Sequence, residues 1–279
     1  MITNSPDREP GDLQLAELLG ESVGAIGGAF MLHPDTLTPG KQAGYPGGFS
    51  YYVVGRGGVL GDVDASVVIS GFAFFAPALV RSLWEAGVVV EGAIHIVHHL
   101  EADGVVAYPR LVIDAEENSE VTVIETFISN DNIHSLVVPV LEVRTGKSAR
   151  VNYLTINQLG LNTWQIGHQQ SAGHRDSTTR LATVALGGDY ARMRTEVRLV
   201  EQGASAQQVA LYFAGGTQMH DFRTLQIHEA PRTHSDLLFK GAVRDTARSV
   251  YTGLIHIKPN AAHSQAFQTN RNLTLSEGA

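Results

Sequence analysis

The sequence of 279 residues contains no cysteine at all. This absence excludes disulfide bonds, thiolate nucleophiles and thiolate metal ligands, and it leads us to expect a cytoplasmic protein. The longest apolar run, VVISGFAFFAPALV at residues 67–80, is shorter than the roughly 20 residues of a membrane-spanning helix, contains Pro77, and predicts a buried helix. The polar, acidic start of the chain shows no secretory signal. We therefore expect neither export nor a membrane partner.

Basic residues are in the minority. Twenty Lys and Arg residues stand against 28 Asp and Glu residues, which gives a formal net charge of -8 at pH 7. A general polyanion binder needs a basic surface to neutralise phosphates, so nucleic acid is not an expected partner. With 43% hydrophobic and only 17% charged residues, the chain can bury a sizeable core and is not disordered by composition.

Residues 1–91 carry patterns that predict a small helical domain. After a polar tail, the apolar positions of residues 13–32 recur at helical spacing. A later apolar segment ends in residues 76–87, where Pro77 suits the first helical turn and Gly87 a C-terminal cap. We expect two or more short helices here, with Gly-rich connections.

Two short helices joined at FFAPA, residues 74–78, could form a DNA-binding helix-turn-helix. The second helix would carry only Arg81 as a basic contact, and phosphate binding needs more positive charge than this. An ordinary helical hairpin is therefore the favoured interpretation.

From about residue 92 onward the pattern changes to short alternating runs between clusters of Gly, Asn, Asp and Ser, which is typical of strands and turns. In the run ARMRTEVRLVE, Met193, Thr195, Val197 and Leu199 share one face of a strand, and charged side chains share the other. One face should be buried and one exposed to water. The runs that suit strands are residues 120–129, 149–157, 178–186, 191–201, 207–215 and 249–257.

These runs recur every twenty-odd residues with no helix between them, which fits either an antiparallel sandwich or a coil of parallel strands. Phrases such as GASAQQVALYFAG and DTARSVYTGLIHI join a turn to a strand with small residues. Small residues suit the tight corners of stacked rungs. We therefore predict a parallel β-helix.

Three segments carry a resemblance to a known family: residues 95–129, residues 191–257, which contain TQMHDFRTLQIHEAPRTHSDLLFKG, and AFQTNRNLTLS at residues 266–276. Together they resemble the core of the SufB/SufD family over residues 92–279. Within this family the chain is more similar to SufD than to SufB, because SufB-type chains carry cysteine in the core and this chain has none.

The resemblance implies a mainly β fold, a right-handed parallel β-helix, that acts as a scaffold subunit in iron–sulfur cluster assembly. It implies a SufB-like partner and a SufC-like ATPase. It also implies that the chain is not an enzyme and binds no cofactor alone, since the cluster is handled by the complex.

The two ends of the chain depart from this family. Residues 20–90 resemble small, uncharacterised bacterial helical proteins, which have no activity to carry over. SufD-like chains continue beyond QTNRNLTLSEGA, residues 268–279, into further rungs, a segment at the SufB interface and helices that engage the ATPase. We therefore expect two domains, residues 1–91 and a C-terminally truncated core at 92–279, with the ATPase contact region missing and an open edge on the last strand.

The stretch at residues 219–241 is rich in metal-ligand side chains: His220, His228, His234, Asp221, Glu229 and Asp236. Zinc sites show short paired spacings on each side of a gap, and neither gap here fits. A turn at EAPRTH should also separate the third histidine from the other two. The pattern favours a polar sheet face over a loose iron or interface site.

A second histidine group lies in HIVHHLEADG. His95 and His99 should point to one face of a strand and His98 to the other. With Glu101 beside them, a polar surface is favoured over a metal pair. We assign no metal ligand here.

The Gly-rich stretch GRGGVLGD, residues 55–62, lacks the Gly-Lys-Ser/Thr ending and the preceding β-α unit of a phosphate loop, and Asp62 would repel phosphate. A loop between helices is favoured, so we do not expect ATP to bind this chain. No catalytic, cofactor-binding or metal residue is assigned anywhere in the sequence.

Two other functions stay open. Many parallel β-helices cleave carbohydrates, and Asp221, Glu229 and Asp236 could act as acid and base. Such an enzyme would usually be exported and would need exposed aromatic rings, whereas the chain has only two Trp residues. Alternatively, the helical half could be a regulatory or partner-binding module fused to an inactive β-helix.

Overall fold

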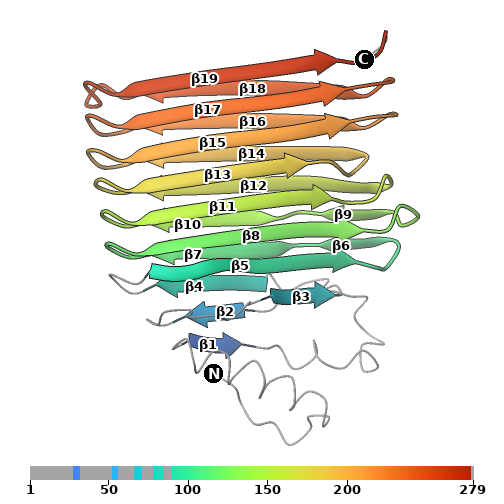
Figure 1. Cartoon of the computed structure of the whole chain (residues 1–279), viewed down its shortest axis with the longest axis horizontal. Helices are drawn as coiled ribbons and strands as arrows, with labels where there is room; N and C mark the ends of the chain where they lie inside the picture. The colour runs from blue at the N-terminus through green and yellow to red at the C-terminus, as the bar shows by residue number, and fades with distance from the viewer. Residues whose placement is uncertain (1–27, 32–51, 56–65, 71–77, 85–88, 278–279) are drawn as a thin grey trace, which may run out of the picture.

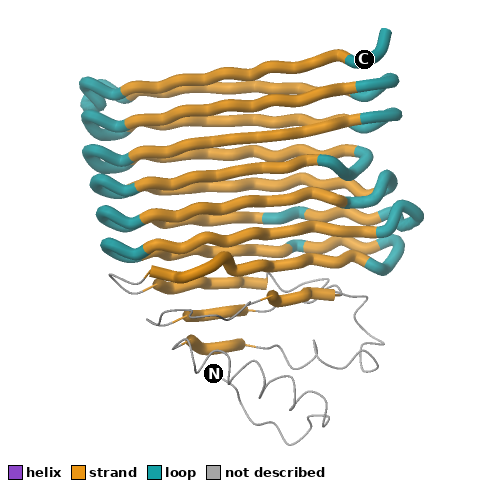
Figure 2. Tube along the Cα trace, in the orientation of Figure 1, coloured by secondary structure: helices purple, strands orange, loops and turns teal. Residues whose placement is uncertain are grey.

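The computed structural model describes residues 28–31, 52–55, 66–70, 78–84 and 89–277. Every element in this part of the chain is a β-strand, and Figure 2 shows long strands joined by short loops at two ends. The described part contains no helix long and apolar enough to cross a lipid bilayer.

The strands form two large sheets, which we name sheet I and sheet II. Sheet I contains β4 (Ala78–Trp84), β6 (Val105–Ala107), β7 (Pro109–Ala115), β9 (Ser135–Val137), β10 (Val140–Thr145), β12 (Thr163–Gly173), β14 (Tyr190–Leu199), β16 (Met219–His228) and β18 (Arg248–Ile257). Sheet II contains β3 (Ser66–Ser70), β5 (Val89–Leu100), β8 (Glu120–Ser129), β11 (Arg150–Gln158), β13 (Thr178–Ala185), β15 (Ser205–Ala214), β17 (His234–Val243) and β19 (Gln265–Thr274).

From β10 onward the chain alternates between the two sheets, so each strand pairs with the strands one full coil before and after it (Figure 1). All pairings within the two sheets are parallel, as in β12 with β14 and β17 with β19. Paired residues such as Trp164 and Tyr190, or His234 and Gln265, show that one coil takes 26 to 31 residues. The predicted β-helix is confirmed, and the antiparallel sandwich is wrong. The first two described strands, β1 (Gly28–Met31) and β2 (Tyr52–Gly55), pair antiparallel with each other.

The core of the coil follows from strict alternation. In β14, Met193, Thr195, Val197 and Leu199 are buried, whereas the charged side chains between them lie on the outer face, as the sequence predicts. Successive rungs stack these buried side chains into one interior between the two sheets. Burial of such apolar surface is the main stabilising contribution to the fold.

Tight turns stack along the edge where the chain passes from sheet I to sheet II. Each contains a residue in the left-handed region of backbone conformation, with φ between 54° and 78°. The short polar side chains or glycine favoured there explain the Asn, Ser, Asp and Gly clusters of the sequence. Backbone bonds join the turns, as from Asn118 N to Lys147 O at 2.9 Å and from Ser148 N to Arg175 O at 2.8 Å. The turn residues are Asn118, Ser148, Asp176, Gly203, Arg232 and His263.

The N-terminal region contradicts part of the sequence prediction. Strands β3 and β4 lie within the segments predicted to be helical, and they pair with β5 and β7 of the coil. The β-branched residues Val67, Val68 and Ile69 favour a strand, and parallel strands often have continuous apolar runs that resemble buried helices. The expected buried helix is wrong for Ser66–Ser70 and Ala78–Trp84, which are strands, whereas the connection FFAPA lies, apart from Ala78, outside the described residues.

Other N-terminal predictions fall outside the described residues. Of the helix predicted at 13–32, the structure describes only Gly28–Met31, which is a strand. Of the Gly-rich loop at 55–62, it describes only Gly55. The separate domain at residues 1–91 stays a prediction.

Candidate functional site

Strand alternation decides where the histidine-rich stretch places its side chains. In β16, His220 and His228 are both fully buried inside the coil, whereas Asp221 belongs to the outward set. A turn then leads to His234, the first residue of β17 in sheet II. The predicted turn is confirmed, but the predicted polar sheet face is wrong for the two buried histidines. No group of three or more His, Asp or Glu side chains in the described part could hold a metal ion.

His228 links the two sheets. Its Nδ1 lies 2.7 Å from Thr233 Oγ1 and its Nε2 lies 2.9 Å from Ser235 Oγ. Burial lowers the pKa of His228 below its ordinary value, and the charge of His234 lowers it further. Both ring nitrogens have polar partners, so the imidazole is a structural bridge.

His220 has fewer hydrogen-bond partners than His228. Its Nε2 donates to the backbone oxygen of Gly187 at 3.3 Å, and its Nδ1 has no partner among the described residues. Burial lowers the pKa of His220 to about 4, so the imidazole is neutral at pH 7. The surrounding rings of Tyr212 and Phe222 explain why no water shell stabilises the charged form.

The three carboxylates proposed as acid and base are far apart. Asp221 and Glu229 lie eight residues apart along one strand direction, a separation of about 26 Å. Glycosidase carboxylates lie within roughly 10 Å of each other. Asp236 is in β17, on the other sheet. The structure does not bring these carboxylates together.

Each of the first two carboxylates is paired with cations instead. Glu229 accepts from Arg198 and from Lys258, both at 2.8 Å, and these contacts lower the pKa of Glu229. Asp221, although buried, lies 3.2 Å from Arg223 and 3.6 Å from Arg192. A general acid needs a raised pKa, and the pKa of Glu229 is instead lowered.

The second histidine group is placed as predicted, with His95 and His99 outward and His98 inward. His99 Nδ1 lies 3.1 Å from Glu101 Oε1 at the surface. The favoured polar surface is wrong for His98, because its side chain is buried and its Nε2 lies 2.7 Å from the buried carboxylate of Glu125. The Tyr153 hydroxyl group donates to the other oxygen of Glu125.

This buried group couples three rungs of sheet II, because β5, β8 and β11 are neighbours. The ring of His98 also stacks on Phe127 at 4.6 Å. Burial raises the pKa of Tyr153 well above 10, and the Glu125 carboxylate raises it further, so the hydroxyl keeps its proton. The only sequence signal was a charged residue, Glu125, at an inward position between the apolar residues Val123 and Phe127.

The outward side chains of β14 and β15 differ in character. On sheet II, β15 exposes Val209, Leu211 and Phe213, with 38%, 56% and 37% of their surface accessible. On sheet I, the outward set of β14 includes Arg192, Arg194 and Arg198, of which Arg194 is the most exposed, while β12 and β18 expose the apolar side chains of Ile166 and Leu254. An anionic group would therefore be attracted to the arginines of β14.

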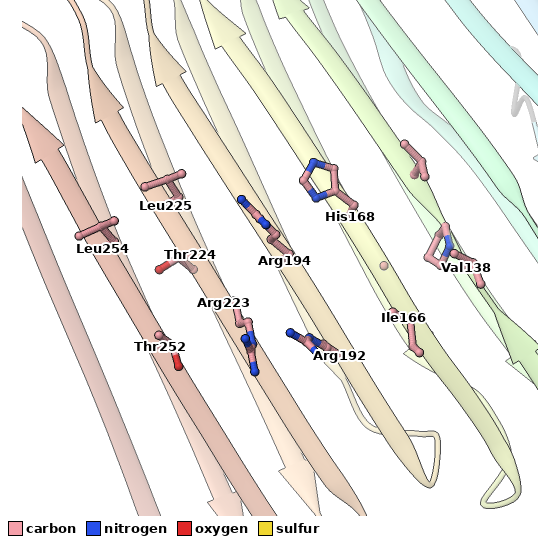
Figure 3. Close-up of a pocket in the computed structure, with 13 residues that line it drawn as sticks. Val138, Ile166, His168, Arg192, Arg194, Arg223, Thr224, Leu225, Thr252 and Leu254 are labelled. Atoms are coloured by element: carbon pink, nitrogen blue, oxygen red, sulfur yellow. The ribbon is translucent and has the colours of Figure 1, made fainter. Parts of the chain in front are cut away.

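A hollow of about 480 Å³ lies on this outer face of sheet I, and Figure 3 shows its side chains. Arg192 and Arg223 point toward one another, and Arg194 extends toward Leu225 (Figure 3). The sequence did not reveal this hollow, because strand register brings together residues about 30 positions apart. Its lining residues are Val138, Pro139, Val140, Ile166, Gly167, His168, Arg192, Arg194, Arg223, Thr224, Leu225, Thr252 and Leu254.

With this geometry in place, comparison with known proteins identifies the coil. Residues 98–279 match the family model described as SUF system FeS cluster assembly, SufBD core domain. The chain belongs to the SufBD family. This match spans sheets I and II from the end of β5 to β19, and it includes the hollow and the buried histidines. The resemblance seen in the sequence is confirmed.

Individual SufBD relatives extend this match. The iron–sulfur cluster assembly SufBD family protein Rv1462 of Mycobacterium tuberculosis is 30% identical over 237 residues, which cover 81% of this chain and 57% of that protein. The iron–sulfur cluster assembly protein SufD of Bacillus subtilis is 28% identical over 220 residues, or 78% of this chain and 48% of that protein. The chain thus spans about half the length of the curated relatives it matches.

A second family model, described as a helix-turn-helix family, matches residues 16–126. It covers the region, residues 20–90, in which the sequence resembles small helical proteins. It also overlaps the SufBD match at residues 98–126. The elements that the structure describes within this range are strands.

Proposed function

We propose that this chain is a SufD-like scaffold subunit of a cytoplasmic iron–sulfur cluster assembly complex, with a SufB-like chain and a SufC-like ATPase as its partners. In this role the chain is not an enzyme and binds no cofactor alone. The cluster is the cargo of the complex.

The observation that carries this proposal is membership of the SufBD family combined with the absence of cysteine. Thiolates are the usual ligands of iron–sulfur clusters. A chain of this family without thiols needs a partner to supply them, so its own contribution is a rigid surface. The parallel coil suits that role, because each rung is fixed by backbone hydrogen bonds to its neighbours.

The end strands β18 and β19 offer a place for such a partner. The N–H groups of Gln265, the first residue of β19, and of Leu275, directly after β19, donate to the backbone oxygens of Thr233, directly before β17, and of Val243, the last residue of β17. Because N–H groups of a parallel strand alternate in direction, those of even-numbered residues such as Gln268 point away from β17. A strand of another chain can pair with this row of donors and acceptors.

Co-purification tests the proposal. The tagged full chain is co-expressed with SufB-like and SufC-like proteins of its own source organism, and the mass of the purified species is measured by light scattering after gel filtration. We expect a stable complex that contains the SufB-like chain. If the tagged chain elutes alone in the presence of an intact SufB-like protein, the scaffold role is wrong.

A further inference from the structure

The hollow on sheet I concentrates positive charge in an acidic chain. Its lining includes three arginines, Arg192, Arg194 and Arg223, and no carboxylate. The whole chain, in contrast, has a formal net charge of -8. The apolar residues Val138 and Ile166 border the hollow on one side, and Leu254 borders it on the other. A ligand that carries both anionic and apolar groups would complement this lining.

Asp221 holds two of these arginines in place. It pairs in register with Arg192 across β14 and β16, and its carboxylate also contacts Arg223 and lies 3.4 Å from the Tyr190 hydroxyl. The carboxylate is almost fully buried. Each guanidinium group has five N–H donors, and this one buried acceptor leaves several of them unused. The arginines are thus preorganised for a second anion, which lowers the entropy cost of binding.

Arg194 is the most accessible of the three. Its side chain is 55% exposed, and its one ionic partner in the described part, Glu196, lies at 3.5 Å on the same strand. Exposed ion pairs of this length contribute little energy and are readily exchanged. A carboxylate placed over the hollow can therefore recruit Arg194 at small cost.

The dimensions of the hollow favour a length of polypeptide over a small molecule. Strand register places Val140, His168, Arg194, Arg223 and Thr252 side by side in one row. Four strand spacings make this row about 19 Å long, which is the span of about six extended residues. Small-molecule sites bury most of their ligand, whereas this hollow lies open on a sheet face (Figure 3).

We infer that the hollow binds an extended acidic segment of another protein, with carboxylates over the arginines and apolar side chains at the two borders. Nucleic acid is the less suitable occupant, since the acidic chain repels a polyanion beyond the hollow. The hollow binds such a segment whether or not the chain joins an iron–sulfur assembly complex.

A designed peptide tests this inference on the full chain. The capped peptide Leu-Ser-Glu-Ser-Glu-Ser-Leu, labelled with an uncharged dye, places Leu, Glu, Glu and Leu on one side over about 20 Å. We expect saturable binding by fluorescence anisotropy, with a Kd on the order of 100 μM at low salt. The same peptide with Gln in place of Glu should bind at least about tenfold more weakly.

Matched variants distinguish the hollow from general charge attraction. The double variant Arg194→Gln/Arg223→Gln should weaken binding about tenfold or more. The control Arg180→Gln/Lys240→Gln removes the same charge from the outer face of sheet II and should keep the affinity within about twofold. Leu254→Asp, at an exposed border residue, should weaken peptide binding through charge repulsion. This variant tests binding at the hollow if the double variant does not fold.

Three results would overturn the inference. One is absence of saturable binding to the unchanged chain. Another is an equal loss of binding in the sheet II control. The third is tighter binding of a twelve-nucleotide oligothymidylate, lost in the same hollow variants, which would make nucleic acid the occupant.

Discussion

The ring of Tyr212 lies against Gly241, its register partner on the next rung of sheet II. A Cβ atom at Gly241 would lie only 1.9 Å from Tyr212 Cε2, so no other residue type fits there without movement. The Tyr212 hydroxyl group passes over this glycine to bond Asn272 on β19. One side chain therefore joins three successive rungs of the coil.

Replacement of this glycine should be costly. Gly241→Ala would force the buried Tyr212 ring against Phe222, whose centroid is 4.8 Å away. We expect a loss of about 1–3 kcal/mol in the free energy of unfolding, as is typical of overpacked cores. Urea denaturation measures it. The exposed neighbour variant Lys240→Ala serves as the control and should change stability by less than about 0.5 kcal/mol. An unchanged midpoint for Gly241→Ala would mean that Tyr212 does not lie there.

Acid should destabilise the coil through His220. Its folded pKa of about 4 lies below the ordinary 6.5, so the unfolded chain binds more protons between these values. The contribution of neutral His220 to the free energy of unfolding is fully present above pH 6.5 and is lost as the pH falls toward 4. Its size is on the order of 3 kcal/mol.

Urea denaturation at pH 7.5 and pH 4.5 checks this contribution. The variant His220→Gln should lose less stability over that interval than the unchanged chain does. His256→Gln, at an exposed position on β18, provides the control and should follow the unchanged chain. Equal pH dependence in all three proteins would show that His220 is not buried as described.

Reconstitution should leave the isolated chain without a cluster. With no thiolate present, only His and carboxylate side chains remain as iron ligands, and the described ones do not converge. Anaerobic incubation with iron and sulfide should give no stable visible absorption after desalting. A SufB-like protein treated in parallel provides the positive control, and a persistent band from this chain alone would contradict the prediction.

When residues 1–279 are expressed without a partner, the edge of β19 should drive self-association. Gln268→Pro removes one outward N–H donor, and proline is tolerated at sheet edges. We expect the purified chain to show concentration-dependent mass by light scattering and this variant to show less. Arg271→Gln changes charge on the outward set of the same strand and is the control. A monodisperse monomer at all concentrations would refute the edge argument.

The sequence predicted much of the coil because period-two alternation is a local property. Strand β14 shows this most clearly, since Met193 and Val197 are buried and Arg194 is outside, as expected. The prediction from sequence failed around Val67–Ile69, because an apolar run has no periodicity that distinguishes a helix from a parallel strand. The alternation of buried and exposed residues can be predicted from one strand alone. The secondary structure of an unbroken apolar run cannot.

The sites depended on information that no single strand contains. Arg192 meets Asp221 only because β14 and β16 are in register 29 positions apart. Similarly, His98 reaches Glu125 across neighbouring rungs. The histidines of β16 looked polar by residue type, whereas their parity with Phe222 places them inside the coil. Parity could have predicted this burial, but no local pattern could have supplied the register.

The stacked turns between the sheets also bear on how the protein is made. Each turn is bonded to the turn one rung away, so a rung can complete its contacts with the preceding rung soon after its last residue is synthesised. At typical translation rates, a ribosome completes a rung of this length in about 1.5 to 6 s. Each finished rung is then the template on which the next one pairs. A register error in an early rung would therefore be copied into every rung that follows.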